Sequence, residues 1–373
     1  MDRFPRNDII SLVDQAPRYD LAESVGPDLQ LAQLLADDGM RELRLGYGSA
    51  AGEGALRQAI AEAHGAAPDN VVVTAGGMHA LFLAAFLLCD RGSEAVVASP
   101  LFPLAANTLR AVGAELRTLP LRFDAGYQPD LDSLRKLLSP ATRLVSLATP
   151  QNPSGVAISR ATLCEIVRLV AERSPHAYLL VDETYREAAY GDAAVAASAV
   201  DLDARVITTG SLSKCHGVPG LRIGWAITRD TALREQLLTA KFSTVLSCGK
   251  LDEWLALRVL QRREHILGER REHLARNLAI TEAWVRRESG RVEWVRPDAG
   301  ALCCVRLRRE VFDGAAVERF HRALPDQEVR VGNGRWFGEE SRVFRLGFGL
   351  LPAPELTNAL ERLSTALKAA SAD

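Results

Sequence analysis

The sequence lacks an excess of positive charge, a long apolar run and any Cys-x-x-Cys pair. Its 373 residues hold 45 Lys and Arg against 47 Asp and Glu, a net charge of -2, so a nucleic-acid partner has no electrostatic basis. No apolar run approaches the roughly 20 residues that a bilayer crossing needs, so we expect no membrane partner. The first residues lack the apolar core of a signal peptide, and we therefore expect a cytoplasmic protein.

The six cysteines are scattered along the chain, which predicts reduced thiols in the core rather than a metal site or a disulfide framework. Repeats and low-complexity segments are also missing. The length favours two domains.

Between about residues 70 and 230, short apolar segments alternate with segments of helical period. The predicted strands are 71–74, 95–99, 143–149, 178–183 and 205–211, and the clearest helices are 78–88 and 160–172. This alternation predicts an α/β fold with a mostly parallel sheet covered on both faces. In such sheets ligands bind at the carboxyl ends of the strands.

The pattern changes after Leu251. A long helical run follows, which we expect to be one connecting helix with a possible kink at Gly268. Segments 292–295, 301–307 and 342–349 then resemble strands and 354–369 a closing helix, which predicts a smaller α+β domain. The first forty residues are irregular and should fold against it. The predicted domains are therefore 41–277, and 1–40 plus 278–373.

The stretch TGSLSKCHGVPGLRIGW places one lysine, Lys214, among small and polar residues. A deprotonated lysine amine forms an imine with an aldehyde, and burial or cationic neighbours lower its pKa. Ser211, Ser213 and Arg222 are suited to a dianionic phosphate. An aldehyde that carries a phosphate suggests pyridoxal 5'-phosphate (PLP); a lysine in a surface loop is the alternative.

SLSKCHGVPGLRIGW resembles the lysine segment of the class I/II aminotransferases, which are fold-type I PLP-dependent enzymes, and other motifs follow in the family's order between about residues 45 and 349. The resemblance implies a mostly parallel mixed sheet in a large domain beside a smaller α+β domain. It also implies an aminotransferase that moves an amino group between an amino acid and a 2-oxo acid through an imine at Lys214.

Two further motifs supply candidates for the cofactor ring. VDETY places Asp182 at a strand end, where a carboxylate would keep the pyridine nitrogen protonated and the ring a better electron sink. Tyr185 would donate to the phenolic oxygen of the ring, and by resemblance Asn152 of TPQNPSG donates to the same oxygen and borders the substrate. A helix cap at Asp182 and a plain Asn-Pro turn are the alternatives. The predicted catalytic residues are Lys214, Asp182 and Tyr185.

VVVTAGGMHAL reads as a strand, a glycine pair and the start of a helix. The N–H groups of a helix N-terminus bind phosphate, and Gly76 and Gly77 would permit close approach. The family often has Ser or Thr where Met78 stands, so we expect one hydroxyl contact to be missing. By resemblance Phe102 stacks on the pyridine face, adding roughly 1 kcal/mol. A simple turn and a plain core aromatic are the alternatives.

The remaining candidates concern the substrate and a second subunit. Arg345 in RVFRLGFG would grip the α-carboxylate of an amino acid, as the family implies. Glu23 of LAES would face a cationic substrate side chain, although a solvated glutamate is an equal alternative. Tyr47, in a Y-x4-G-x3-LR pattern, would reach the phosphate of the partner's cofactor, which predicts a homodimer with a shared active site.

Other functions stay open at this point. The lysine segment is also similar to that of capreomycidine-synthase-like cyclases, so a PLP-dependent cyclase, lyase or oxidase acting on an arginine-like amino acid is an alternative. A DNA-binding regulator is disfavoured because the segment before Tyr47 is short and not basic. An inactive relative is disfavoured because the motif residues are all present. Cys215 and His216 follow the lysine, and we expect them to be structural.

Overall fold

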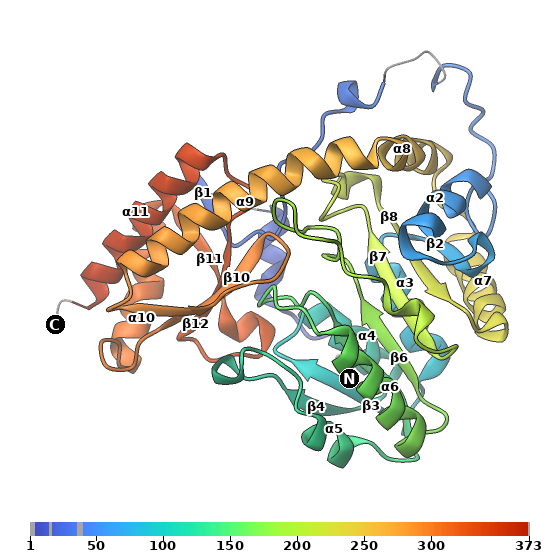
Figure 1. Ribbon diagram of the computed structural model, residues 1–373, viewed down its shortest axis with the longest axis horizontal. Helices are drawn as coiled ribbons and strands as arrows, with labels where there is room; N and C mark the ends of the chain where they lie inside the picture. Colours follow the sequence, from blue (N-terminus) through green and yellow to red (C-terminus); the bar gives the residue numbers. More distant parts are fainter. Residues whose placement is uncertain (1–3, 15–16, 36–39, 372–373) are drawn as a thin grey trace.

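The computed structural model describes residues 4–14, 17–35 and 40–371, which form two β-sheets with helices around them (Figure 1). The strands are β1 (Tyr19–Leu21), β2 (Val71–Ala75), β3 (Glu94–Ser99), β4 (Glu115–Pro120), β5 (Thr142–Ala148), β6 (Tyr178–Asp182), β7 (Val206–Ser211), β8 (Ile223–Thr228), β9 (Val292–Val295), β10 (Leu302–Leu307), β11 (Val329–Asn333) and β12 (Val343–Gly347). The helices are α1 (Ser11–Asp14), α2 (Gly54–His64), α3 (Gly77–Leu88), α4 (Pro103–Val112), α5 (Leu131–Leu137), α6 (Arg160–Arg173), α7 (Thr231–Val245), α8 (Lys250–Gln261), α9 (Arg263–Arg287), α10 (Gly314–Ala323) and α11 (Ala353–Ala370).

The larger sheet has seven strands in the order β2-β8-β7-β6-β5-β3-β4. The pairs from β4 through β7 are parallel, whereas β8 runs antiparallel to both β2 and β7. This is the mostly parallel mixed sheet that the family resemblance implied.

Apolar side chains pack helices onto both faces of this sheet. Helices α5 and α6 cover one face, burying Leu134 and Ile166 against Val145 and Val181. On the same face α2 and α8 pack against β2 and β8. Helices α3, α4 and α7 cover the opposite face. Strands buried on both faces explain the continuous apolar runs of the sequence.

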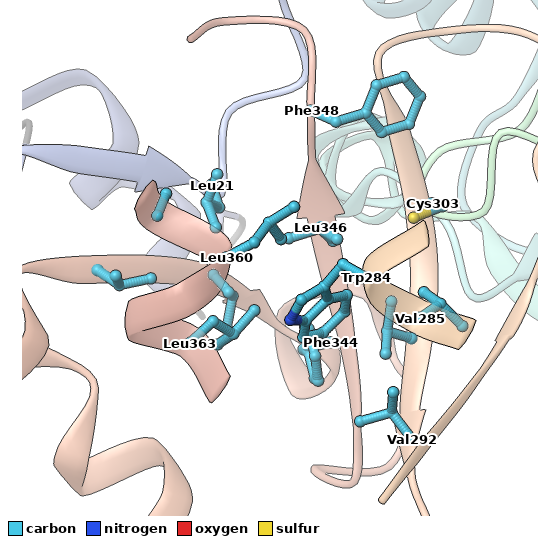
Figure 2. Close-up of a cluster of buried hydrophobic side chains, with 14 of the residues drawn as sticks. Leu21, Trp284, Val285, Val292, Cys303, Phe344, Leu346, Phe348, Leu360 and Leu363 are labelled. Carbon is cyan, nitrogen blue, oxygen red and sulfur yellow. The ribbon is translucent and has the colours of Figure 1, made fainter. Parts of the chain in front are cut away.

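The smaller sheet has five strands in the order β1-β11-β12-β10-β9. Trp284 of α9 and Leu360 of α11 pack against its strand residues, among them Phe344 and Leu346 (Figure 2). The N-terminal strand β1 lies parallel to β11, with Tyr19 opposite Val329. Strand β1 thus joins the smaller sheet as expected, whereas Leu34 of the same N-terminal segment packs in the core against β2 and β8 of the larger sheet.

The predicted strands and helices of residues 70–230 are confirmed with shifts of one or two residues at their ends, while β4 and β8 were not predicted. The prediction of a single long helix after Leu251 is wrong. The chain forms α8 and α9 with a break at Arg262, whose φ of -103° and ψ of 14° lie outside the helical range, and Gly268 lies inside α9.

Helix α9 runs from α8 beside the larger sheet to the smaller sheet (Figure 1). The predicted domain boundary at residue 277 falls within it, and the two-domain division stays a prediction. None of the helices in the described ranges is long and apolar enough to cross a bilayer.

Candidate active site

Two neighbouring parallel strands end at the predicted catalytic residues. Strand β6 ends at Asp182, which lies opposite Thr209 of β7, and β7 ends at Ser211, three residues before Lys214. Because parallel strands share one carboxyl edge, the carboxylate and the lysine segment meet at the same edge of the sheet.

The Lys214 amine lies within ion-pair distance of one carboxylate. Its Nζ is 4.0 Å from Oε2 of Glu23, and 27% of the lysine side chain is exposed. Loss of hydration is the main influence and lowers the pKa of Lys214. The cations of Arg345 and Arg222 lower this pKa as well, against the opposing effect of Glu23. A lowered pKa makes the neutral, reactive amine more available.

The Asp182 carboxyl group uses one oxygen for its structural contacts. Oδ1 accepts hydrogen bonds from the Thr184 amide at 3.0 Å and from the Thr184 hydroxyl at 2.6 Å. In the described part of the chain no hydrogen bond is made to Oδ2, which leaves it for another donor. Burial raises the pKa of Asp182, and a cationic donor beside it would oppose that shift.

A chain of hydrogen bonds connects the predicted ring donors to the predicted carboxylate receptor. Arg345 Nη1 donates to Oδ1 of Asn152 at 2.9 Å, and Nδ2 of Asn152 lies 3.5 Å from the Tyr185 hydroxyl oxygen. That hydroxyl is 2.8 Å from Oγ of Ser24. Burial raises the pKa of Tyr185, so it remains a neutral phenol that can donate a hydrogen bond.

Arg345 is almost fully buried, with only 2% of it exposed, and several contacts fix its position. Its Nη2 donates to the Ala22 carbonyl oxygen, and its Cζ lies 4.6 Å from the centre of the Phe337 ring. Nε is buried with no hydrogen-bond partner among the described residues. Burial lowers the pKa of the guanidinium, and a carboxylate ligand would relieve that cost.

The N-terminus of α3 forms a cradle with two polar side chains. At Gly76, φ is 77° and an added Cβ would overlap Nη2 of Arg222, so the guanidinium lies directly against this backbone. At Gly77 the nearest side-chain atoms belong to Ser211. A helix N-terminus with a guanidinium and a hydroxyl beside it suits a phosphate dianion.

The structure places the other predicted residues as follows. Ser213 is partly buried, and its amide lies 3.4 Å from the Ser211 hydroxyl. Met78 is half-buried against the apolar core under α3, so no hydroxyl is present there. Phe102 is half-buried at the start of α4. Tyr47 is 88% exposed in the loop before α2.

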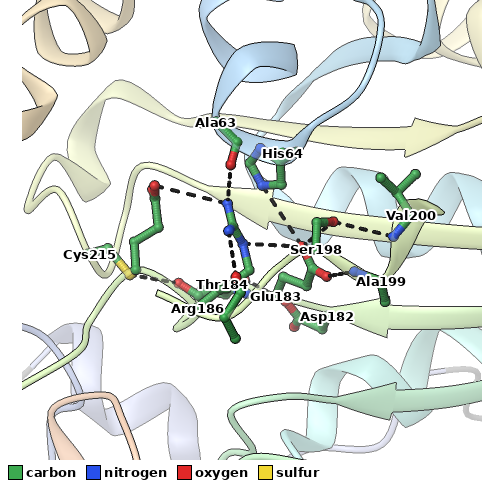
Figure 3. Close-up of polar contacts among 12 residues, drawn as sticks. Ala63, His64, Asp182, Glu183, Thr184, Arg186, Ser198, Ala199, Val200 and Cys215 are labelled. Atoms are coloured by element: carbon green, nitrogen blue, oxygen red, sulfur yellow. Dashed lines mark hydrogen bonds and ion pairs between the residues drawn. The ribbon is translucent and has the colours of Figure 1, made fainter. Parts of the chain in front are cut away.

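A buried polar cluster fixes the loop that carries Asp182 and Tyr185 (Figure 3). Glu183 accepts hydrogen bonds from Ser198 at 2.8 Å and from the Ala199 amide at 2.6 Å, and its carboxylate is 3.4 Å from Nε of Arg186. Burial raises the pKa of Glu183 to about 7. The loop that holds the catalytic candidates is thus anchored from behind.

Cys215 and His216 tie the lysine segment to this loop. The Cys215 thiol donates to the Thr184 carbonyl at 3.2 Å, and Nε2 of His216 is 3.5 Å from Oε2 of Glu187. Burial raises the pKa of Cys215 to about 12 and lowers that of His216 to about 4, so near neutral pH both are uncharged. Their buried, anchoring positions agree with the structural roles expected of them.

Sequence reasoning missed two contacts. The Thr184 hydroxyl donates a hydrogen bond to the Asp182 carboxylate, and the Ser24 hydroxyl is hydrogen-bonded to the Tyr185 hydroxyl. Thr184 was detectable as a hydroxyl two residues after the strand-end carboxylate, a typical Asx-turn pattern. Ser24 lies 161 residues from its partner, and nothing local in the sequence signals that contact.

These residues fit PLP. The cradle at Gly76, Ser211 and Arg222 would hold the phosphate, and Lys214 offers an amine whose pKa is lowered. Oδ2 of Asp182 and the Tyr185 hydroxyl would hold the ring nitrogen and the phenolic oxygen. Each polar group of the cofactor has a partner of matching chemistry.

The chain is similar in sequence and in fold to known proteins. The sequence profile of the family Aminotransferase class I and II matches residues 9–363. Capreomycidine synthase of Streptomyces vinaceus is 32% identical over 335 residues, covering 90% of this chain and 84% of the relative. The arginine–pyruvate transaminase of Pseudomonas aeruginosa is 30% identical over 335 residues, covering 85% and 81%.

Among solved structures, a PLP-dependent aminotransferase from Streptococcus suis is similar with a TM-score of 0.90 and 26% identity, and the match covers 99% of both chains. The profile spans nearly the whole chain, and the relatives and the fold agree with it. The chain therefore belongs to the class I and II aminotransferases and is a PLP-dependent enzyme of that family.

Proposed function

We propose that this aminotransferase takes the amino group from an amino acid with a cationic side chain, of the arginine or lysine kind, and passes it to a 2-oxo acid. The observation that carries the proposal is the Glu23 carboxylate, which faces the site 4.0 Å from the Lys214 amine. When Lys214 is covalently bound to the cofactor, its ammonium is lost, and with it the one ion pair that Glu23 makes among the described residues, although Arg345 still acts on Glu23 electrostatically. A guanidinium or ammonium on the substrate would replace that charge.

The chain's own residues divide the work of the reaction. The bound cofactor supplies an electron sink that makes the Cα proton of an amino acid acidic. Arg345 would hold the substrate carboxylate, and Asp182 would keep the ring nitrogen protonated. The lowered pKa of Lys214 suits its amine to remove the Cα proton and to return it as a general acid.

Glu23→Gln tests the substrate class. We expect kcat/KM for arginine to fall roughly ten- to 150-fold, since a charge-assisted hydrogen bond contributes about 1.5–3 kcal/mol, while kcat/KM for an uncharged amino acid of similar length changes little. Asp28→Asn is the matched control, because Asp28 is another acid with an electrostatic influence on Lys214 but is exposed. If Glu23→Gln slows charged and uncharged substrates equally, Glu23 acts on Lys214 and the proposal is wrong.

A cyclase, lyase or oxidase that acts on the same class of amino acid is the second candidate, because of the 32% identity to capreomycidine synthase. The two functions differ in whether the amino group leaves the substrate. Enzyme, arginine and 2-oxoglutarate are incubated together and glutamate is measured. New glutamate supports transamination, and consumption of arginine without glutamate supports the alternative.

We further infer a homodimer in the cytoplasm. Tyr47 is 88% exposed, and a partner subunit would cover it together with exposed apolar residues such as Leu45 and Phe242. The six unpaired cysteines suit a reducing compartment. If Tyr47 serves the partner's site, mixing Lys214→Ala and Tyr47→Ala proteins under subunit exchange creates one intact site per mixed dimer and restores activity. If Tyr47 serves its own chain, the mixture stays as weak as its components.

A further inference from the structure

Three consecutive residues of the N-terminal segment each touch a different functional side chain. The Ala22 carbonyl accepts from Arg345, Glu23 faces Lys214, and Ser24 bonds to Tyr185. Ser24 and Tyr185 are both buried, and their oxygen atoms are 2.8 Å apart. The Ser24 contact is therefore a full hydrogen bond shielded from water, and its direction decides what Tyr185 can do.

The phenol of Tyr185 has one proton to donate. Asn152 already presents an N–H to this oxygen at 3.5 Å, as its amide oxygen accepts from Arg345. If Ser24 also donates, the Asn152 N–H and the Ser24 O–H both bond to the lone pairs of the phenol oxygen. The Tyr185 proton then remains free to be donated to a third group. If Ser24 instead accepted, the Tyr185 proton would be consumed within the protein.

We propose that Ser24 is a positioning residue, which donates its hydroxyl proton to Tyr185 and so holds the Tyr185 hydroxyl ready to donate to the phenolic oxygen of the bound cofactor. The inference depends on the placement of Tyr185 at that oxygen. Ser24 itself touches neither cofactor nor substrate and acts through the tyrosine.

The test is a pH titration of the visible absorbance of the bound cofactor in four proteins: wild type, Ser24→Ala, Tyr185→Phe and the double variant. A hydrogen bond to the phenolic oxygen favours its ionised form, so its loss raises the titration midpoint. We expect Tyr185→Phe to raise the midpoint, and Ser24→Ala to raise it by roughly half to one pH unit, the worth of a neutral hydrogen bond.

The double variant separates the inference from a general structural effect. If Ser24 acts through Tyr185, Ser24→Ala causes no further shift in the Tyr185→Phe background. Ser24→Thr, which keeps the hydroxyl, should return the midpoint to the wild-type value. Equal shifts by Ser24→Ala in both backgrounds would overturn the proposal, and so would an unmoved midpoint in Ser24→Ala beside a raised one in Tyr185→Phe.

If Tyr185→Phe leaves the midpoint unchanged, the placement of Tyr185 is wrong and the inference falls with it. None of these readouts depends on which amino acid is the substrate. Failure of the cationic-substrate proposal and failure of this one are therefore told apart.

Discussion

Gly76→Ala should separate the cofactor cradle from the backbone that forms it. Gly76 has φ 77° and ψ 168°, a region that only glycine occupies without strain, and an added Cβ would lie 3.1 Å from Cζ of Arg222 and overlap its Nη2. The substitution therefore has two effects. It strains the junction of β2 and α3, and it pushes the guanidinium out of the cradle.

The two effects have different sizes and different readouts. Strain of this kind costs about 1–3 kcal/mol and lowers the free energy of unfolding of the apoprotein. Loss of a charged hydrogen bond from Arg222 to the phosphate costs about 1.5–3 kcal/mol, which weakens PLP binding roughly ten- to 150-fold. Spectrophotometric titration of the apoprotein with PLP measures the second effect, and denaturant unfolding measures the first.

Gly92→Ala is the matched control. Gly92 also has a positive φ, 90°, but no atom lies within 4 Å of an added Cβ. We expect it to lose stability without losing affinity for PLP. In an Arg222→Ala background, Gly76→Ala should weaken binding little further, because the displaced group is already gone. Equal affinities of the Gly76→Ala and Gly92→Ala proteins would refute the assignment of Arg222 to the phosphate.

Three further predictions concern other parts of the site and its surroundings. Arg345→Lys should raise KM for amino acids roughly tenfold or more, because a lysine cannot reproduce the bidentate contact, and steady-state kinetics with PLP saturating checks this. Asp182→Asn should lower kcat about ten- to 150-fold while the fold persists, as single-turnover kinetics beside circular dichroism would show. Burial lowers the pKa values of His64 and His216 to about 4. Between pH 6.5 and pH 4 the unfolded chain therefore binds protons at these histidines that the folded chain does not bind. The free energy of unfolding should fall over this range by up to about 3 kcal/mol for each histidine. His216→Gln should reduce that loss, as denaturant titrations at several pH values would show. Glu183 has a pKa raised to about 7, so its contribution to the free energy of unfolding increases as the pH falls.

The sequence was most informative where function depends on strand ends. The runs before Asp182 and Lys214 are short, apolar and bounded by polar residues, which is what buried parallel strands require. Once those strands are parallel neighbours, their carboxyl ends meet, so the lysine and the carboxylate had to share an edge. The order of the motifs along the chain also made the aminotransferase family predictable.

The break at Arg262 and the contact of Ser24 with Tyr185 were out of reach for a different reason. No glycine or proline marks the break, and a helical pattern runs through it. The side chain of Arg262 instead bonds to the Gln33 carbonyl in a distant segment. Ser24 likewise gains its role from a partner 161 residues away. Both residues contact segments far away in the sequence, and such tertiary contacts can override the local propensity from which a sequence is interpreted.

The residues proposed to carry out the reaction and those proposed to select the substrate lie on different sheets. Asp182 ends β6 and Lys214 follows β7, so the parallel register of the larger sheet fixes the two groups that we propose take part in the reaction. Arg345 lies on β12, and the segment that carries Glu23 follows β1, which pairs with β11 of the smaller sheet. Changes in the smaller sheet or its N-terminal strand should therefore alter which amino acid is accepted, and changes at the ends of β6 and β7 should alter the reaction itself.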